Sequence, residues 1–310
     1  MKNKKVLVTG GLGFIGSHIV EELVENNEIT IIDDESTGKI DNLNCIEHSN
    51  ITLIKENLNN LDLDEILKNI DYVFHLAAMA SVPLSVDQPL KSTENNLNAT
   101  IKLAISCKNQ YIKKIVFASS SAVYGNNINT PLKETEPLNP TSPYAASKAS
   151  CELYLKSFIE SYNLNSVSLR FFNVFGPKQD VNSQYAAVIP NFIYALINDK
   201  EPIIYGDGNQ TRDFIYVKDI VKACISACES DYNGVVNVAS GEEITINELF
   251  EAIQNILNSN INPKYLDERK GDIKYSSADV SRMKKINFKA DPTMFKRQIE
   301  ETVKWFKNYN

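Results

Sequence analysis

A tyrosine and a lysine four positions apart, Tyr144 and Lys148, are the residues of this sequence best suited to acid–base chemistry. On a helix, positions i and i+4 share a face, so the ammonium can lie near the phenol. A nearby positive charge favours the phenolate and lowers a pKa that is about 10 in a free tyrosine. The spacing alone is also common on amphipathic helices, so its interpretation depends on the rest of the chain.

A glycine-rich turn near the start of the chain indicates what the phenol would act beside. The turn follows a predicted strand and opens a predicted helix, and its glycines stand at Gly10, Gly11, Gly13 and Gly16. Glycines at this spacing allow a tight turn and let the backbone approach a pyrophosphate, which rests on the helix N-terminus. The turn predicts a bound dinucleotide, so that hydride can leave an alcohol carbon for a nicotinamide while the phenol takes the proton.

Asp33 ends the second predicted strand roughly 20 residues after the turn, where a carboxylate can accept hydrogen bonds from the adenosine ribose. A carboxylate there also repels a 2′-phosphate, so NAD is predicted rather than NADP. Asp34 could share this role. Lys39 is the one nearby cation that argues against the choice of NAD over NADP. After the fourth strand, the small pair Ala77 and Ala78 either leaves room for the cofactor or packs a helix on the sheet.

The segment Ser119–Gly125 begins with three serines directly after the fifth predicted strand. Its hydroxyls therefore belong to the carboxyl edge of the sheet, where ligands bind in such folds. A hydroxyl there can bond a substrate oxygen and relay its proton to a phenolate, but serines also cap helix N-termini. The sequence leaves both roles open.

Short β-branched runs alternate with helical patterns in the first half of the chain, which predicts a doubly wound, Rossmann-type parallel α/β sheet. Strands are expected at Lys5–Thr9, Glu28–Asp33, Ile51–Glu56, Tyr72–Leu76, Lys114–Ser119, Ser166–Phe171 and Val235–Ala239. Helices are expected at Gly13–Glu25, Pro89–Asn109, Pro143–Ser161 and Met294–Lys307, with a strand–helix pair at Asp213–Cys228. We expect an NAD-binding domain at 1–173, to which 213–240 returns, and a smaller C-terminal α+β substrate domain at 174–212 and 241–310.

The bulk properties exclude several classes of partner. The 310 residues are 43% hydrophobic, and the chain carries a charge of −7 with a pI near 5.2, so nucleic acid is not expected as a partner. No apolar run approaches the roughly 18 residues that span a bilayer, and the lysine-rich start is interpreted as the lead into a first strand, not as a signal peptide. The five cysteines are odd in number and scattered, which fits a reducing cytoplasm. Cys224 and Cys228 lie one helical turn apart without a neighbouring histidine and are interpreted as small core residues, so no metal site is predicted.

With these features in this order, the chain resembles the extended short-chain dehydrogenase/reductase family over nearly its whole length, and within it the UDP-hexose 4-epimerases. The matching segments are Gly10-x-x-Gly13-x-x-Gly16, His75–Ala78, Asn96-x-x-x-Thr100, Ser119–Gly125, Tyr144–Lys148, Arg170–Pro177, Gly206–Phe214 and Arg269-x-Gly271-Asp272. Each match alone is weak, but the ordered set is highly specific.

The resemblance implies roles for individual residues. It implies that Ser120 is the catalytic hydroxyl, Tyr144 the base, and Lys148 the group that holds the nicotinamide ribose and lowers the Tyr144 pKa. The implied NAD contacts are Gly10, Gly13, Phe14, Ile15, Gly16, Asp33, Asn57, Leu58, Ala77, Ala78, Asn96, Ser119, Tyr144 and Lys148. The implied substrate contacts are Ser81, Ser121, Asn173, Val188, Arg212, Arg269, Asp272 and Ser276. Among these, the asparagine and the two arginines would bind the diphosphate, since the guanidinium fork suits phosphate oxygens.

Two positions depart from the family pattern. Asn57 stands where members often carry an aspartate as an adenine contact, and an amide can still bond the adenine edge. Lys270 replaces a common proline, which alters the local loop but leaves the role of Arg269 in place. A third comparison concerns the reaction itself. Dehydratases of the family carry an acidic pair just after the catalytic hydroxyl, and Ser121 and Ala122 cannot do that work.

The resemblance therefore favours inversion at C4 through a transient 4-keto sugar, without net redox change. It places Ser276 at the wall that meets the C2 substituent of the sugar, where a bulky aromatic residue excludes N-acetyl groups. A serine leaves room, so we expect UDP-N-acetylglucosamine and UDP-N-acetylgalactosamine to be accepted as well as UDP-glucose and UDP-galactose. The neighbouring Tyr275 could close the space if the loop were shifted.

Two other functions are kept as alternatives. A uronate epimerase or decarboxylase would need a cation for the C6 carboxylate, which Lys178 or Arg282 could supply. A catalytically silent NAD-binding scaffold would not need Ser120, Tyr144 and Lys148, yet all three are present. The apolar stripes of the helices expected at Pro89–Asn109 and Pro143–Ser161 suit a homodimer, as in the family.

Overall fold

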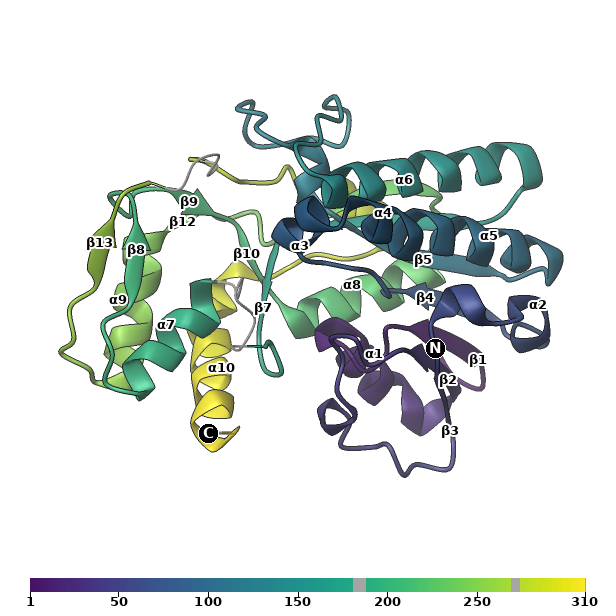
Figure 1. Ribbon diagram of the computed structural model, residues 1–310, viewed down its shortest axis with the longest axis horizontal. Helices are drawn as coiled ribbons and strands as arrows, with labels where there is room; N and C mark the ends of the chain where they lie inside the picture. The colour runs from purple at the N-terminus through teal and green to yellow at the C-terminus, as the bar shows by residue number, and fades with distance from the viewer. Residues whose placement is uncertain (181–187, 269–273, 310) are drawn as a thin grey trace.

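The computed structural model describes residues 1–180, 188–268 and 274–309, which form a larger lobe around one sheet and a smaller lobe beside it (Figure 1). Seven parallel strands build the sheet in the order β11-β6-β5-β4-β1-β2-β3. Their bounds are β1 Lys5–Thr9, β2 Glu28–Asp33, β3 Ile51–Lys55, β4 Tyr72–His75, β5 Lys114–Ser120, β6 Ser166–Phe171 and β11 Gly234–Val238. The order reverses between β1 and β4, and ligands bind at such a switch point, beyond the carboxyl ends of the strands.

Helices cover both faces of the sheet, as the doubly wound prediction requires (Figure 1). On one face lie α1 (Phe14–Leu23) and α8 (Val217–Glu229), and on the other α2 (Leu63–Ile66), α5 (Ala99–Asn109) and α6 (Pro143–Tyr162). Because both faces are covered, β6 is buried at every residue. The two apolar cores between sheet and helices fix the strand ends on which the candidate site is built.

The smaller lobe is built from short elements of the second half of the chain (Figure 1). Its strands are β7 Asn173–Phe175, β8 Ile203–Tyr205, β9 Thr211–Arg212, β10 Phe214–Tyr216, β12 Ile244–Thr245 and β13 Lys264–Leu266. Its helices are α7 Val188–Ile197, α9 Ile246–Leu257 and α10 Phe295–Tyr309, and they share an apolar core of their own. A capping box starts α9, where Thr245 Oγ1 accepts from Glu248 N and the Glu248 carboxylate accepts from Thr245 N.

The helix expected at Pro89–Asn109 differs from the prediction in its middle. It begins as α4 (Pro89–Ser92), continues as a π-helical segment (Thr93–Asn98) and ends as α5. A short helix, α3 (Val82–Asp87), precedes it. π-Helical turns occur often at functional sites, and this one carries Asn96, a predicted site residue.

Candidate active site

Backbone packing at the switch point leaves no room for side chains in the glycine turn. Gly10 has a φ of +70°, and a Cβ added there would lie 2.7 Å from the backbone nitrogen of Ala77, which follows β4. A Cβ on Gly16 would lie 2.0 Å from the carbonyl oxygen of Gly10. The turn after β1 and the chain after β4 therefore touch through their backbones, and together they present a shallow cradle at the N-terminus of α1. This is the arrangement a dinucleotide pyrophosphate requires.

Asp33 lies at the end of β2 beside this cradle and is 7% exposed. Its Oδ2 accepts from Leu12 N and its Oδ1 from Glu35 N, both at 2.9 Å. Burial raises the pKa of this carboxyl, and the two backbone N–H groups oppose that rise. Each oxygen retains a second lone pair for a ribose hydroxyl, so the residues present fit NAD.

The predicted adenine contact Asn57 joins the same corner through Asp34. Its Nδ2 donates to Asp34 Oδ2 at 2.9 Å, and its Oδ1 accepts from Asn59 N at the start of a single 3₁₀ turn. Leu58 is buried in the core beneath this turn. Because Asn57 fixes the Asp34 carboxylate, both residues of the acidic pair after β2 are held in place.

A directed chain of hydrogen bonds supports the turn after β4 from below. The Thr100 hydroxyl donates to Asn96 O at 2.6 Å, so it accepts from His75 Nε2 at 2.9 Å. His75 Nδ1 is then an acceptor for the Thr9 hydroxyl at 2.7 Å, and Thr9 Oγ1 accepts from Ala77 N. Burial lowers the pKa of His75 to about 3, so the ring is neutral and the direction of the chain is fixed.

The side chain of Asn96 is buried, and protein groups contact its oxygen and its nitrogen. Its Oδ1 accepts from Met79 N at 2.7 Å, and its Nδ2 donates to Met79 O and to Ser147 Oγ. The hydroxyl of Ser147 in turn donates to Tyr144 O on α6. The resemblance implies that Asn96 contacts NAD, and the structure gives its amide a further position, between the turn after β4 and the helix that carries Tyr144.

The residues predicted to be catalytic converge at the carboxyl end of β5. Ser142 caps α6 by accepting from Ala145 N, so the helix starts at Pro143, with Tyr144 in its first turn and Lys148 one turn further on. Lys148 Nζ donates to Ala118 O at 2.7 Å and lies 6.0 Å from the Tyr144 ring centre. Ser120 accepts from Ala122 N and also hydrogen-bonds the Tyr144 side chain. Ser120 therefore caps a 3₁₀ turn, one of the two roles left open by the sequence, and is also within hydrogen-bonding reach of the phenol.

The electrostatics of this cluster differ from the expectation in one respect. Burial raises the pKa of Tyr144, and the hydrogen bond from Ser120 opposes this rise. Burial also lowers the pKa of Lys148 to about 8, against the nearby Cys151 and Glu152. The sequence predicts that Lys148 lowers the pKa of Tyr144. In the protein alone, burial of the phenol raises this pKa instead. The Lys148 ammonium donates to Ala118 O and not to the phenol.

The predicted substrate residues lie on the smaller lobe and along the edge of the larger one. Asn173 begins β7 and donates to Asp213 O at 2.9 Å, while Arg212 in β9 donates to Thr211 O. Ser276 is 9% exposed, whereas Tyr275 is 50% exposed. Successive side chains of an extended segment point to opposite sides, so Tyr275 does not share the side of Ser276.

The other predicted contacts are distributed as follows. Ser81 caps α3, Ser121 begins the 3₁₀ turn Ser121–Tyr124, and Val188 is the first residue of α7. Phe14 and Ile15 begin α1 and pack against the core of the smaller lobe, and Ala78 is half-buried after β4. Arg269, Lys270 and Asp272 lie outside the described residues.

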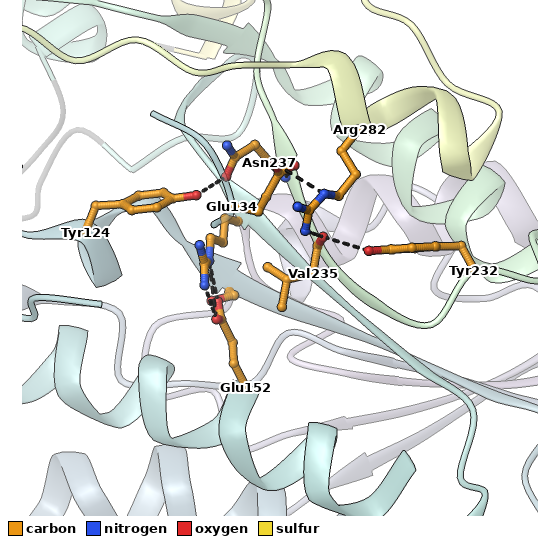
Figure 2. Close-up of polar contacts among 9 residues, drawn as sticks. Tyr124, Glu134, Glu152, Tyr232, Val235, Asn237 and Arg282 are labelled. Atoms are coloured by element: carbon orange, nitrogen blue, oxygen red, sulfur yellow. Dashed lines mark hydrogen bonds and ion pairs between the residues drawn. The ribbon is translucent and has the colours of Figure 1, made fainter. Parts of the chain in front are cut away.

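One buried group that the sequence analysis missed, Glu152 (Figure 2), contacts the predicted site through Ser119. Glu152 forms two-point contacts with Arg170, at 2.9 Å to Nε and 2.6 Å to Nη2, and accepts from the Ser119 hydroxyl. The proton of Ser119, a predicted NAD contact, is therefore directed at Glu152. A signal was present, since Glu152 stands four residues after Lys148 and so shares its helix face.

The network of Figure 2 continues to the sheet edge through the ring of Tyr124, which lies 4.6 Å from the Arg170 guanidinium. The Tyr124 hydroxyl donates to Asn237 Oδ1 at 2.6 Å on β11. Arg282 donates to Val235 O on the same strand and pairs with the buried Glu134 at 3.4 Å. The serine-bearing end of β5 is thus fixed to β6 and β11 by charged and aromatic groups.

A cavity of about 340 Å³ lies elsewhere, between β10, α8 and the start of α10. Phe214, Tyr216, Asp219, Ser240 and Phe295 are among its lining residues, and none of the predicted site residues is. Within the described parts of the chain, no group of three or more His, Cys, Asp or Glu side chains is placed to hold a metal ion. No helix among the described residues is long and apolar enough to cross a bilayer.

Comparisons with known proteins agree with this geometry. Residues 7–305 match the GDP-mannose 4,6 dehydratase family. A solved UDP-N-acetylglucosamine 4-epimerase from Methanobrevibacter ruminantium, in complex with UDP-N-acetylmuramic acid, is 62% identical over the whole of both chains, with a TM-score of 0.99. The UDP-glucose 4-epimerase of Thermus thermophilus, solved with NAD, is 33% identical over 99% of this chain and 100% of its own, with a TM-score of 0.88.

A curated relative gives the same result. The putative UDP-glucose 4-epimerase of Methanocaldococcus jannaschii is 38% identical over 309 residues, which cover 98% of this chain and 99% of that one. The chain therefore belongs to the GDP-mannose 4,6 dehydratase family of extended short-chain dehydrogenases/reductases.

Proposed function

We propose that the protein is an NAD-dependent UDP-hexose 4-epimerase that accepts N-acetylated as well as plain sugars. The observation that carries this proposal is the convergence of Ser120, Tyr144 and Lys148 at the carboxyl end of β5, beside the glycine turn. Neither Ser121 nor Ala122 can supply the acid that a dehydratase needs after the catalytic hydroxyl. Inversion at C4 requires only this cluster and a retained cofactor.

NAD would be held by the turn of Gly10, Gly13 and Gly16, by Asp33 and by Lys148. When bound, it supplies a reversible hydride acceptor and, in its oxidised form, a positive charge that favours a nearby phenolate. The protein residues divide the remaining work. Tyr144 takes the proton of the sugar hydroxyl, and Ser120, already bonded to the phenol, passes that proton across.

The proposed division of labour follows the two lobes except at Asn173 and β10 (Phe214–Tyr216), which lie in the smaller lobe. Residues 1–173 and 213–240 would hold the cofactor, and residues 174–212 and 241–310 the sugar nucleotide. Asn173, Arg212 and Arg269 would bind the diphosphate, and Ser276 would face the C2 substituent. The small side chain of Ser276 and the outward-facing Tyr275 support room for an acetamido group, which a tyrosine at position 276 would fill.

The uronate alternative is disfavoured by the two cations it would use. Lys178 pairs with Glu21 of α1 at 2.5 Å, and its side chain is 7% exposed. Arg282 is held by Glu134 and Val235 O at the far edge of the sheet. Both charges already have carboxylate partners, so neither is placed to meet a C6 carboxylate.

The decisive experiment measures turnover of UDP-glucose, UDP-N-acetylglucosamine and UDP-glucuronate by product analysis. We expect interconversion of the first two with their C4 epimers and none of the third. Tyr144→Phe should lower kcat by about 10²- to 10⁴-fold, the range for loss of a general base, with NAD retained. Tyr162→Phe, on the exposed end of the same helix, is the matched control. Equal activity of the two variants would refute the assignment of the base.

We also propose that the protein is a cytoplasmic homodimer. Large apolar side chains are exposed along α3 to α6, among them Val86 at 59%, Leu90 at 85% and Leu153 at 57%. Burying such a patch against a second copy would remove it from water. The five cysteines are unpaired, which suits a reducing compartment. Light scattering on the wild type and on Leu90→Glu/Leu153→Glu tests the dimer, which the double variant should dissociate.

A further inference from the structure

A single buried aspartate, Asp213, joins three segments around the proposed sugar side of the site, two through its carboxylate and one through its backbone. Asp213 is fully buried, between β9 and β10. Its Oδ1 accepts from Ser240 N at 2.8 Å and from the Ser240 hydroxyl at 2.7 Å, and its Oδ2 accepts from Gly241 N at 3.1 Å. The backbone N–H of Ala278 bonds the same carboxylate. The chain after β11 and the chain before residue 279 are therefore both anchored on one side chain.

The backbone of the same residue holds two predicted substrate contacts. Asp213 O accepts from both the backbone and the side-chain nitrogen of Asn173, at 3.2 and 2.9 Å. Asp213 N donates to Ser276 O at 2.9 Å. A displacement of Asp213 would therefore move Asn173 and Ser276 together.

The segment that carries Ser276 depends on these anchors because, apart from an isolated bridge between Leu132 and Ala278, it belongs to no strand of the sheets. Lys274 O accepts from Thr211 N on one side, and Ser277 O accepts from Leu132 N on the other. The hydrogen bond from Ala278 N to the Asp213 carboxylate fixes the segment beyond Ser276. These hydrogen bonds fix the orientation of the segment, in which Ser276 is buried and Tyr275 is exposed.

We propose that Asp213 is a positioning residue for substrate binding, whose carboxylate fixes the wall at Ser276 and the amide of Asn173 against the end of β11. The inference rests on the proposed function in that it takes Asn173 and Ser276 as contacts of the sugar nucleotide. Burying a carboxylate is costly, and here it raises the Asp213 pKa to about 6 although four N–H and O–H groups oppose the rise. A hydrophobic residue could fill the space but could not accept from the donors of the two segments at Ser240–Gly241 and Ala278.

The test is Asp213→Asn, which keeps the shape of the side chain and one acceptor oxygen. Its new NH₂ group must face either the two Ser240 donors or the N–H of Gly241, so at least one anchor is lost. We expect the KM for the UDP-sugar and the Kd for UDP alone to rise at least tenfold. We expect kcat to stay within threefold and the content of bound NAD to be unchanged, because Tyr144 and the glycine turn lie on other elements.

Asp279→Asn is the matched control, since Asp279 stands beside Ala278 but caps only the turn at Ser281. It should leave the KM and the Kd within twofold of wild type. Should Asp213→Asn fail to fold, Ser240→Ala removes one donor to the carboxylate and should raise the Kd for UDP two- to fivefold. The ratio of kcat/KM for acetylated and plain sugars should also change in either variant.

The outcomes separate the two proposals. If the wild type binds UDP but turns over no UDP-hexose, the proposed function fails, and titration of UDP still tests Asp213. If Asp213→Asn binds UDP as tightly as the control Asp279→Asn does, the positioning role of Asp213 is overturned. A loss of kcat at unchanged KM also overturns it, because Asp213 would then act on the chemistry and not on binding.

Discussion

Glu152→Gln tests whether the buried ion pair with Arg170 holds the larger lobe together. The Glu152 and Arg170 side chains are 3% and 4% exposed, and the guanidinium reaches both carboxylate oxygens (Figure 2). The substitution leaves the shape and one oxygen acceptor in place but removes the negative charge. The buried guanidinium then has no countercharge within this contact.

The magnitude follows from that geometry. Breaking a buried pair from one side costs about 3–5 kcal/mol, because one charge remains buried without compensation. Glutamine still accepts one hydrogen bond from Arg170, so we expect the lower end, about 3 kcal/mol of unfolding free energy. Since about 1.4 kcal/mol is a factor of ten, the unfolded fraction should rise by about two orders of magnitude. A domain of ordinary stability remains folded after such a loss.

The measurement is guanidinium denaturation with NAD in equal excess, because ligand binding shifts the apparent stability. Glu160→Gln, on the exposed side of the same helix, is the control and should change the free energy by less than about 0.5 kcal/mol. Glu152→Leu combined with Arg170→Met removes both charges and should be more stable than Glu152→Gln. The reasoning is refuted if Glu152→Gln costs under about 1 kcal/mol at an unchanged m value.

Three further predictions follow from single side chains. Gly16→Ala places a Cβ 2.0 Å from Gly10 O and should lower both the Tm and the NAD content, measured by thermal unfolding and by release of nucleotide. His75→Gln should flatten the pH dependence of stability. The folded state keeps His75 neutral down to a pKa of about 3, while the unfolded state protonates it below about 6.5. Between pH 6 and pH 4 the wild type should therefore lose about 1.4 kcal/mol more unfolding free energy per pH unit than the variant, as measured by urea titrations. Ser276→Tyr should abolish turnover of the N-acetylated pair and preserve that of UDP-glucose, by product analysis of both pairs. Equal loss on both pairs would contradict the steric argument.

The sheet and its helices could be predicted because buried parallel strands are short, uniformly apolar runs between helical patterns. The strands expected at Lys5–Thr9, Glu28–Asp33 and Ser166–Phe171 have these bounds in the structure, and the Rossmann-type fold is confirmed. The π-helical segment at Thr93–Asn98 could not be predicted. A change from i→i+4 to i→i+5 hydrogen bonds leaves the apolar spacing of so short a stretch almost unaltered.

In the candidate site, too, some features can be predicted from the sequence and others cannot. Gly10, Gly16, Tyr144 and Lys148 can be found from the sequence because their chemistry depends on local spacing along the chain. The hydrogen bonds of Asn96 cannot be found in this way, since its partners Met79 and Ser147 lie 17 and 51 residues away. Partners so distant are brought together only by tertiary packing, and their hydrogen bonds leave no period in the sequence.

The junction of the lobes shows why the smaller lobe cannot act as an independent module. β7 pairs in parallel with β10, and the chain then returns through α8 to β11 in the main sheet. Asn173, the first residue of β7, therefore follows the last residues of β6 almost directly. Ser120, whose hydroxyl is proposed to act in catalysis, lies on the next strand, in register with Phe171. A small rotation of the lobes would change the sugar contacts at Asn173 and Ser276 while leaving Ser120, Tyr144 and Lys148 in place, so substrate affinity should be more sensitive to the junction than the chemical step is.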